Sequence, residues 1–280
     1  MFLVAASAIL LISDWQNRKD SKNRAQKVRI ALFRFNANPV QEETEKGVLK
    51  VLEGLRAFRD GKIEIRRFSA EGDMPTANMI ASNIVSEKFD YVVSISTPGL
   101  QVMANANQEG RVKHIFCAVT DPVASGVGIT GSASDQHPPF LAGIGTFQPV
   151  ESVFRMARQM NPQLKKVGVV WCTSETCSEA CVKKARAICD ELHIELMEMS
   201  VETVSQVYEA ALAVSLKGVE ALWIGGDNVV ESAIEMYIGA ASKNHIPVFT
   251  NNPNHTFSGA MLSLGANYYE VGLTAGMMLD

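Results

Sequence analysis

Short segments rich in Ser, Thr, Asn and Asp follow several apolar runs, and they hold the residues best suited to bind a ligand. In the clearest of them, the apolar run Tyr91–Ile95 stops at Ser96-Thr97-Pro98. The run has the composition of a strand buried on both faces, while Ser or Thr caps a helix and proline suits its first turn. A strand, a tight turn and a helix N-terminus direct free backbone N–H groups above the sheet edge. This arrangement suits a small anion, a carboxylate as readily as a phosphate.

Similar polar segments follow the other predicted strands of the chain. Ligands of parallel sheets gather beyond the carboxyl ends of the strands, so these segments define one candidate site. Its predicted ligand-binding residues are Phe35, Asn36, Asn38, Ser96, Thr97, Thr120, Asp121, Thr173, Ser174, Glu175, Ser178, Asp227, Asn228, Asn251 and Tyr268. This set of amides, hydroxyls and isolated acids suits a small zwitterion. Helix N-termini would hold its carboxylate, and Asp121, Asp227 or Glu175 would hold its ammonium.

Each of these residues also has a purely structural interpretation. Asp121 before Pro122 is typical of a turn, and Asp227 with Asn228 is typical of a helix N-cap. Phe35 could belong to the core rather than to a pocket wall. The prediction of a site therefore depends on all of these residues falling at equivalent strand ends.

The chain carries none of the common catalytic signatures. It contains no Gly-x-Ser-x-Gly, no P-loop lysine motif and no Gly-x-Gly-x-x-Gly after the first strand, and its five histidines are scattered. We interpret Cys117 and Cys189 as small buried side chains. Cys172, Cys177 and Cys181 leave one disulfide or a thiolate metal site open, but they lack Cys-x-x-Cys spacing. We predict a binding protein with no catalytic residue, cofactor or metal.

Apolar runs alternate with amphipathic segments along the chain and predict an α/β fold of two lobes. Strands are expected at 27–35, 63–68, 91–95, 114–119, 141–147, 166–171, 194–199, 221–225, 248–250 and 260–264, with helices between most of them. Such an order implies parallel sheets with right-handed crossovers. We predict an N-terminal lobe of residues 28–147 with 265–280, and a C-terminal lobe of residues 148–264. Hinges are expected near Phe147 and Gly265.

The composition is that of an ordinary α/β protein and excludes some classes of partner. The chain has 280 residues, of which 47% are hydrophobic and 20% charged, and its net charge is −4. Acidic and basic residues are interspersed, whereas a nucleic-acid-binding surface needs a clustered basic face. We therefore expect a small-molecule ligand and no nucleic acid.

Residues 1–27 stand apart from the rest, because the apolar run Phe2–Ile12 is followed by the basic stretch Arg18–Lys27. The run is too short to span a bilayer, which takes about 20 apolar residues. It also lacks the basic start and small-residue cleavage site of a signal peptide. We interpret 1–27 as a membrane anchor, or the tail of a membrane segment, plus a linker. The basic stretch by itself favours a cytoplasmic position for residues 28–280, so the side of the membrane stays open at this point.

Five motifs occur in a characteristic order along the chain. They are Glu71-Gly72-Asp73-Met74-Pro75-Thr76-Ala77-Asn78, Ser96-Thr97-Pro98, Phe116-Cys117-Ala118-Val119-Thr120-Asp121-Pro122-Val123, Gly226-Asp227-Asn228 and Ile246-Pro247-Val248-Phe249. Together they resemble the ABC-transporter substrate-binding family that includes the TrpX-like tryptophan-binding proteins. The resemblance implies a type I periplasmic-binding-protein fold, whose lobes close on a ligand in an extracytoplasmic setting. It also implies an amino acid, often aromatic, as ligand and an ABC permease in the membrane as partner.

The resemblance assigns roles to five of the candidate residues. Carried over by position, Ser96, Thr97 and Thr120 would hold the ligand carboxylate, while Asp227 and Asn228 would contribute from the second lobe.

The loop after Trp171 departs from the family pattern. Members often read Asn-Pro-x-Glu-x-Asn-Ser there, whereas this chain reads Cys172-Thr173-Ser174-Glu175-Thr176-Cys177-Ser178. Glu175 and Ser178 are retained, but cysteine replaces both amides, so the resemblance does not fix the ligand. We predict an extracytoplasmic, membrane-anchored solute-binding component of an ABC importer, on the periplasmic side. The alternative is a membrane-tethered ligand-sensing module of a signalling or regulatory protein.

Overall fold

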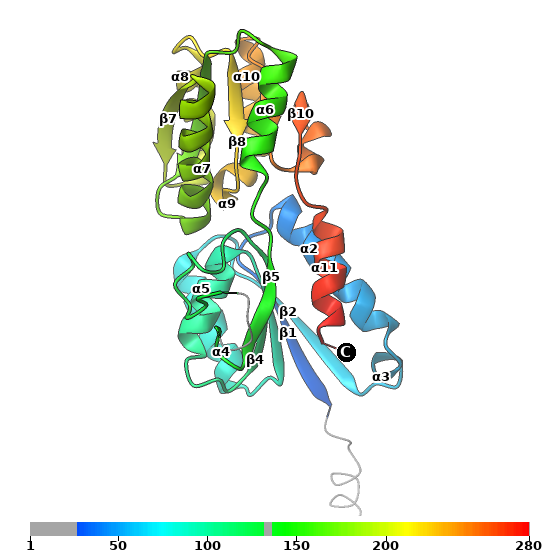
Figure 1. The fold of residues 1–280 in the computed structure, drawn as a ribbon. Helices are drawn as coiled ribbons and strands as arrows, with labels where there is room; N and C mark the ends of the chain where they lie inside the picture. The colour runs from blue at the N-terminus through cyan, green and yellow to red at the C-terminus, as the bar shows by residue number, and fades with distance from the viewer. Residues whose placement is uncertain (1–26, 132–135, 280) are drawn as a thin grey trace, which may run out of the picture.

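Two parallel five-stranded sheets, one in each lobe, organise the chain (Figure 1). The computed structural model describes residues 27–131 and 136–279. The first sheet has the order β2-β1-β3-β4-β5 and the second β10-β9-β8-β6-β7. Every paired strand in both sheets is parallel to its neighbour. The predicted α/β architecture of two parallel sheets is confirmed.

Within the described residues, the first lobe has five strands and four helices before the chain crosses over. They are β1 (Val28–Arg34), α2 (Pro39–Gly54), α3 (Arg56–Arg59), β2 (Ile63–Ser69), α4 (Met74–Ser86), β3 (Tyr91–Ile95), α5 (Thr97–Ala106), β4 (Lys113–Val119) and β5 (Leu141–Gly145). The strands read as apolar runs because β1, β3 and β4 lie inside the sheet and are covered by helices on both faces.

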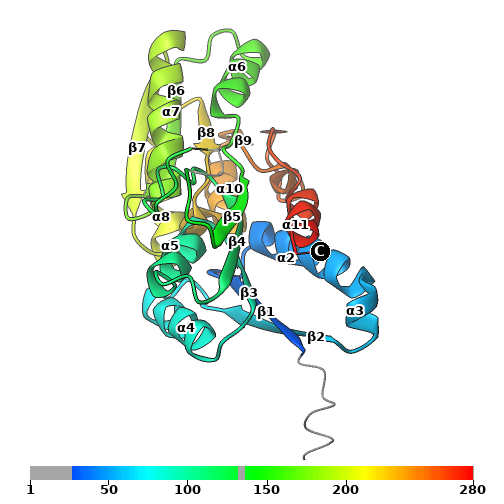
Figure 2. The same cartoon turned by 60° about the horizontal axis from the view of Figure 1, so that its bottom comes forward.

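The second lobe repeats the same alternation. It contains α6 (Val150–Met160), β6 (Lys166–Cys172), α7 (Thr176–Leu192), β7 (Glu195–Val201), η1 (Val204–Gln206), α8 (Val207–Ser215), β8 (Ala221–Ile224), α9 (Asn228–Glu231), α10 (Ile234–Lys243), β9 (Val248–Thr250), η2 (Pro253–Thr256) and β10 (Leu262–Ser263). The last helix, α11 (Tyr268–Met277), returns to the first lobe and lies beside α2 (Figures 1 and 2).

Two glycines let α11 and α2 approach backbone to backbone. A Cβ added at Gly47 would lie 2.2 Å from the Tyr269 carbonyl oxygen, and one at Gly272 would lie 2.0 Å from the Thr44 carbonyl oxygen. Any larger side chain at either position would force the helices apart.

The described chain crosses between the lobes twice, between β5 and α6 and between β10 and α11.

Two of the helical segments between strands are interrupted. The segment 40–59 breaks at Leu55, which is extended with φ −67° and ψ 140°. The segment 229–243 breaks between α9 and α10, where the Ser232 hydroxyl donates to the Asn228 carbonyl oxygen at 2.7 Å. A serine that bonds the backbone in this way competes with regular helix. The second break is relevant to function, because Ser232 also contacts the other lobe.

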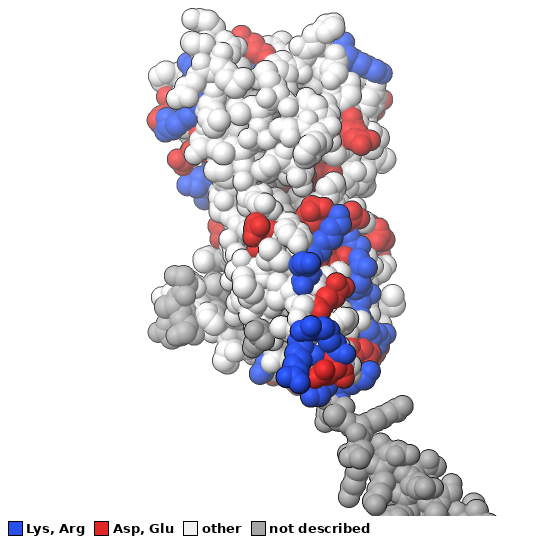
Figure 3. All heavy atoms as spheres, turned by 90° about the vertical axis from the view of Figure 1, so that its right-hand side faces the viewer, with Lys and Arg blue, Asp and Glu red and all other residues white. Residues whose placement is uncertain are grey.

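The charged residues of the first lobe are mixed in sign. Figure 3 shows Lys and Arg gathered low on one face of this lobe with Asp and Glu between them, whereas the second lobe carries fewer charges on that face. The ion pairs of the lobe include Arg67 with the buried Glu45, whose nitrogen and oxygen lie 2.6 Å apart. This face is a network of opposite charges and not a patch of one sign.

The predicted anchor in residues 1–27 lies, except for Lys27, outside the described residues. Among the described helices, none combines the length and apolar character needed to cross a membrane. All five cysteines are buried free thiols, so the disulfide considered for Cys172, Cys177 and Cys181 is absent from the structure. Burial raises the pKa of the Cys117 and Cys181 thiols to about 12.

Candidate functional site

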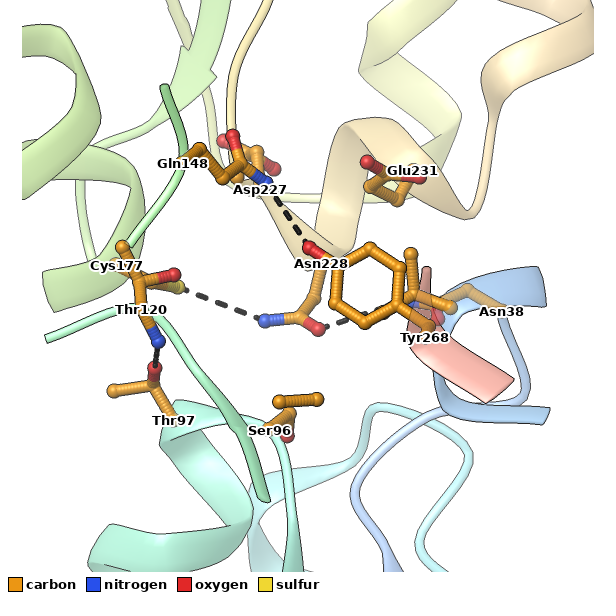
Figure 4. Close-up of a pocket in the computed structure, with 13 residues that line it drawn as sticks. Asn38, Ser96, Thr97, Thr120, Gln148, Cys177, Asp227, Asn228, Glu231 and Tyr268 are labelled. Carbon is orange, nitrogen blue, oxygen red and sulfur yellow. Dashed lines mark hydrogen bonds between the residues drawn. The ribbon is translucent and has the colours of Figure 1, made fainter. Parts of the chain in front are cut away.

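A small cavity lies between the two lobes, where the carboxyl ends of both sheets face each other (Figure 4). We call it the inner cavity. Its lining residues are Asn38, Val40, Ser96, Thr97, Ala118, Thr120, Gln148, Cys177, Gly226, Asp227, Asn228, Glu231 and Tyr268. Its volume is about 30 Å³, so the side chains of its walls nearly fill it. Both lobes and one of the crossing segments contribute to it.

The first-lobe wall is built on two residues with a strained backbone. Ser96 has φ 84° and Ala118 has φ 53°, values that residues other than glycine rarely adopt. Ser96 follows the last residue of β3 and Ala118 lies near the end of the neighbouring strand β4, and the Ser96 N–H donates to the Cys117 carbonyl oxygen at 3.1 Å. Strain of this kind persists where the surrounding structure enforces it, and it concentrates at binding sites.

Other described residues with positive φ have an ordinary explanation. Lys88, His193 and His245 each lie just beyond the last residue of a helix, where a left-handed residue commonly ends the helix. Ser96 and Ala118 have no such role, because Ser96 precedes a helix and Ala118 lies within a strand. Their conformation therefore singles out the cavity wall.

Two threonines complete this wall. Ser96 caps α5, since its hydroxyl accepts from the Gly99 N–H at 3.4 Å, and the Thr97 hydroxyl accepts from the Thr120 N–H at 3.3 Å. The Thr120 side chain is 7% exposed, and no described residue pairs with its hydroxyl. Pro98 has no N–H, and the N–H groups of Gly99 and Leu100 bond to Ser96. The first turn of α5 therefore leaves the Thr97 N–H without a described acceptor. This wall can therefore offer hydrogen-bond donors to an anionic group.

The second-lobe wall is acidic, and Asp227 is its central residue. Asp227 caps α9 by accepting from the Val230 N–H at 2.8 Å, and it accepts from the Cys172 N–H and the Ser178 hydroxyl at 2.6 Å each. Burial raises the pKa of this carboxyl, while these three hydrogen bonds act in the opposite direction. The carboxylate is held in place by neutral donors, with no basic side chain to neutralise it.

Glu175 supports the same wall from the loop after β6. Its Oε2 accepts from the Asn228 N–H at 2.9 Å, from the Asn228 amide at 3.1 Å and from the Cys177 thiol at 3.3 Å. Burial, reinforced by the charge of Asp227, raises the pKa of the Glu175 carboxyl to about 7. Glu231, one helical turn after Asp227, accepts from Asn252 and His255 at 3.0 and 2.6 Å.

The raised pKa of Glu175 predicts a specific pH dependence of stability. The folded protein keeps this proton to about pH 7, whereas the unfolded chain releases it near pH 4.5. The bound proton therefore makes its full contribution to the free energy of unfolding below pH 4.5. This contribution, about 3 kcal/mol in total, is lost as the pH rises from 4.5 to 7. Glu175→Gln, which cannot ionise, should remove this part of the slope. Urea unfolding of both proteins without ligand, between pH 4.5 and 8, tests it, and parallel stability curves would refute the assignment.

No lysine or arginine lies among the residues that line the inner cavity. Asp227 and Glu231 face it from the second lobe, and Glu175 lies one hydrogen bond behind Asn228. Glu231 has His255 as a partner, whereas no basic side chain among the described residues bonds to Asp227 or Glu175. Buried carboxylates are costly unless a cation pairs with them. The inner cavity therefore suits a ligand with a positive group toward the second lobe and an anionic group toward α5.

Direct hydrogen bonds join the two lobes across this cleft. Asn36 donates to Ser232 at 2.7 Å, and the Asn228 amide oxygen accepts from Gln41 at 2.9 Å and from Asn38 at 3.5 Å. The same Asn228 is bonded to Glu175. The structure thus shows the lobes in contact, with Asn228 as the residue that connects the acidic wall to the first lobe.

A second, larger cavity continues the cleft on the other side of these contacts. We call it the outer cavity. Its lining residues are Phe35, Asn36, Glu71, Gly72, Met74, Pro98, Gln101, Cys172, Ser174, Glu175, Glu202, Thr203, Val204 and Val229. Its volume is about 520 Å³. Adjacent residues, such as Thr97 and Pro98, divide between the two cavities, so the cavities are neighbours.

The structure brings most of the predicted residues to this cleft. Asn38, Ser96, Thr97, Thr120, Asp227, Asn228 and Tyr268 line the inner cavity, and Phe35, Asn36, Ser174 and Glu175 line the outer one. Ser178 is buried behind Asp227 and orients it. Thr173 is exposed and donates to Glu202 at 2.6 Å.

Two predicted residues lie elsewhere. Asp121 accepts from the N–H groups of Val123 and Ala124 at 3.1 and 3.0 Å, which is the turn role that its sequence also allows. Asn251 is fully buried, and its amide accepts from the Trp223 indole at 2.9 Å. Their side chains are occupied by local structure rather than turned into either cavity.

Several lining residues were missed from the sequence. Glu231 follows Asp227 by four residues, so helical spacing could have found it. Cys177 is adjacent to the predicted Ser178, and Gly226 to the predicted Asp227. Gln148 lies at the predicted boundary between the lobes. Nothing in the sequence shows that it turns back into the cavity and approaches the Tyr268 hydroxyl at 3.5 Å.

Comparison with known proteins gives a consistent result. Residues 29–280 match the family described as ABC transporter substrate binding protein. A tyrosine-binding protein of Clostridioides difficile (strain R20291) is 29% identical over 263 residues, which cover 93% of this chain and 73% of the relative.

Solved structures match the fold as well. A conserved domain protein from Vibrio cholerae is 26% identical with a TM-score of 0.82, and a Streptococcus pneumoniae ABC domain in complex with L-Trp is 19% identical with a TM-score of 0.83. Each match covers 90% of this chain and 83% of the other. The predicted type I periplasmic-binding-protein fold is confirmed by these matches.

Proposed function

The chain belongs to the ABC transporter substrate-binding protein family, and from this premise we propose that it binds an amino acid between its lobes for import by an ABC permease. The family consists of solute-binding proteins and not of enzymes, and its members are extracytoplasmic. The ligand is held by binding alone, and no bond in it is made or broken.

The observation that carries this proposal is the opposite character of the two walls of the inner cavity. The second lobe presents buried carboxylates, Asp227 and Glu231, with no lining lysine or arginine. The first lobe presents the N-terminus of α5 and the unpaired Thr120 hydroxyl. An α-amino acid carries an ammonium and a carboxylate on neighbouring atoms, so it can satisfy both walls at once.

The strained residues fit this assignment. Positive φ at Ser96 turns the chain sharply between β3 and α5, which places the first turn of α5 against the cavity. We assign the ligand carboxylate to the Thr97 N–H and to the hydroxyls of Thr97 and Thr120. We assign the ammonium to Asp227, with Glu231 as the second nearby charge.

Closure of the lobes couples binding to transport in this proposal. The contacts of Asn228 with Gln41 and Asn38 exist only when the lobes meet. A ligand that bridges the walls favours this arrangement, because it interacts with both lobes only when they are together. The closed surface is what the permease would recognise, and the two crossing segments near Phe147 and Gly265 would act as the hinge.

The relatives support the amino acid class. One relative is a tyrosine-binding protein, and a matching structure holds L-Trp. A thermal-shift screen of the purified protein against the twenty amino acids tests the proposal. At 100 times its Kd, a ligand should raise the free energy of unfolding by about 2.7 kcal/mol.

The N-acetylated form of any amino acid that shifts the protein is the matched control, because it lacks the ammonium. It should give no shift at the same concentration. A screen in which no amino acid stabilises the protein, or in which N-acetylated forms act equally well, would contradict the proposal.

A further inference from the structure

The outer cavity has room for the part of a ligand that the inner cavity cannot hold. The inner cavity has a volume of about 30 Å³ and the outer cavity one of about 520 Å³. If the charged end of an amino acid occupies the inner cavity, its side chain must extend along the cleft. The outer cavity is next to the inner one, because Pro98 and Val229, which line it, directly follow Thr97 and Asn228, which line the inner cavity.

The walls of the outer cavity combine apolar and acidic surfaces. Phe35, Pro98 and Val229 offer apolar contact, and two of them directly follow residues of the inner cavity in the sequence. Glu71 from the first lobe and Glu202 from the second also line it. No lysine or arginine is among its lining residues.

Glu175 marks the boundary between the two cavities. Its side chain is only 8% exposed, and its Oε2 accepts all of its described hydrogen bonds, from Asn228 and Cys177. No described residue donates to its other oxygen, Oε1, although Glu175 lines the outer cavity. This oxygen is accessible from the cavity, so it is free to accept a hydrogen bond from a donor that a ligand supplies.

The two outer acids keep spare capacity to accept hydrogen bonds. Glu71 accepts one bond from the Ser69 hydroxyl, at 2.5 Å, and Glu202 accepts one from Thr173, at 2.6 Å. An ionised carboxylate has about four lone-pair sites, so most remain available. The φ of 50° at Glu71 belongs to the tight turn that the Asp73 N–H closes on the Ala70 carbonyl oxygen at 2.9 Å. Carboxylates accept and never donate when ionised, so they select a donor.

We propose that the outer cavity takes the ligand side chain and selects one that is apolar along its length and ends in a cationic donor, an ammonium or a guanidinium. This inference rests on the proposed function, since it concerns the side chain of the same ligand. The apolar walls contact the methylene stem, and Glu71 and Glu202 pair with the terminal charge from opposite lobes. The pairing adds a contact between lobes that only a basic ligand can bridge.

Matched ligand pairs test the charge directly. Lysine and norleucine have the same stem with and without the terminal ammonium, and arginine and citrulline differ in the guanidinium charge. Titration calorimetry at low salt should show at least tenfold tighter binding for the basic member of one pair. Equal or tighter binding of norleucine and citrulline, or tightest binding of an aromatic amino acid, would overturn the inference and leave the proposed function standing. Failure of every amino acid to bind would overturn both.

Variants locate the effect in the outer cavity. Glu71→Gln and Glu202→Gln should each lower the affinity for the basic ligand about threefold to tenfold and leave the affinity for its neutral partner unchanged. Glu53→Gln is the matched control, because Glu53 is also exposed on the first lobe but lines neither cavity. Equal losses for the basic and neutral members, or equal losses in the control, would overturn the inference.

Discussion

Replacing Asp227 with asparagine is expected to lower the affinity for an amino acid by about 100-fold or more. The change keeps the shape of the side chain but removes the buried charge to which we assign the ligand ammonium. Loss of one partner of a buried, hydrogen-bonded charge pair costs about 2–5 kcal/mol, and 100-fold corresponds to about 2.7 kcal/mol. Titration calorimetry with the amino acid that gives the largest thermal shift measures this loss.

Ser178→Ala is the matched control for this prediction. Ser178 donates to Asp227 at 2.6 Å but lines neither cavity, so its loss weakens the support of the carboxylate without removing the charge. We expect a loss of tenfold or less. The assignment of the ammonium is contradicted if Asp227→Asn folds normally and binds within threefold of the natural protein.

A valine at Gly226 is expected to hold the lobes apart. A Cβ at Gly226 would lie 3.0 Å from the Gln148 amide nitrogen and 3.3 Å from the Thr120 hydroxyl. The larger valine side chain would fill the inner cavity from the second lobe and collide with the first lobe on closure. We expect at least a tenfold loss of affinity and no decrease in radius of gyration when the amino acid is added.

Gly239→Val gives the comparison that this experiment needs. Gly239 is exposed on α10, and a Cβ there would meet no atom within 4 Å. Solution X-ray scattering of both variants, with and without amino acid, separates blocked closure from a general effect of valine. Ligand-induced compaction of Gly226→Val equal to that of Gly239→Val would contradict the closure mechanism.

Much of the fold follows from patterns that are local in the sequence. The strand Tyr91–Ile95 and its polar turn are found as predicted, because an apolar run followed by a cap and a proline admits few other structures. The rule that ligands gather at strand ends also brings Ser96 and Asp227 to one cavity, although 131 positions separate them in the chain.

The remainder of the site depends on tertiary contacts that a sequence pattern does not carry. Asn251 ends a strand as predicted, but the indole of Trp223 occupies its amide. Gln148 reaches the inner cavity only because the crossing segment passes beside Tyr268. The inner cavity is closed in part by the bond of Asn228 with Gln41, which joins the two lobes, while the bond of Asn228 with Glu175 lies within the second lobe.

The orientation of a bound amino acid tests the central claim most directly. A crystal structure of the protein with the amino acid that stabilises it most should show the lobes closed, with the ammonium nitrogen about 3 Å from the Asp227 carboxylate. The ligand carboxylate should lie at the first turn of α5, beside Thr97 and Thr120. A ligand in the reverse orientation, or one bound outside the inner cavity, would contradict the account.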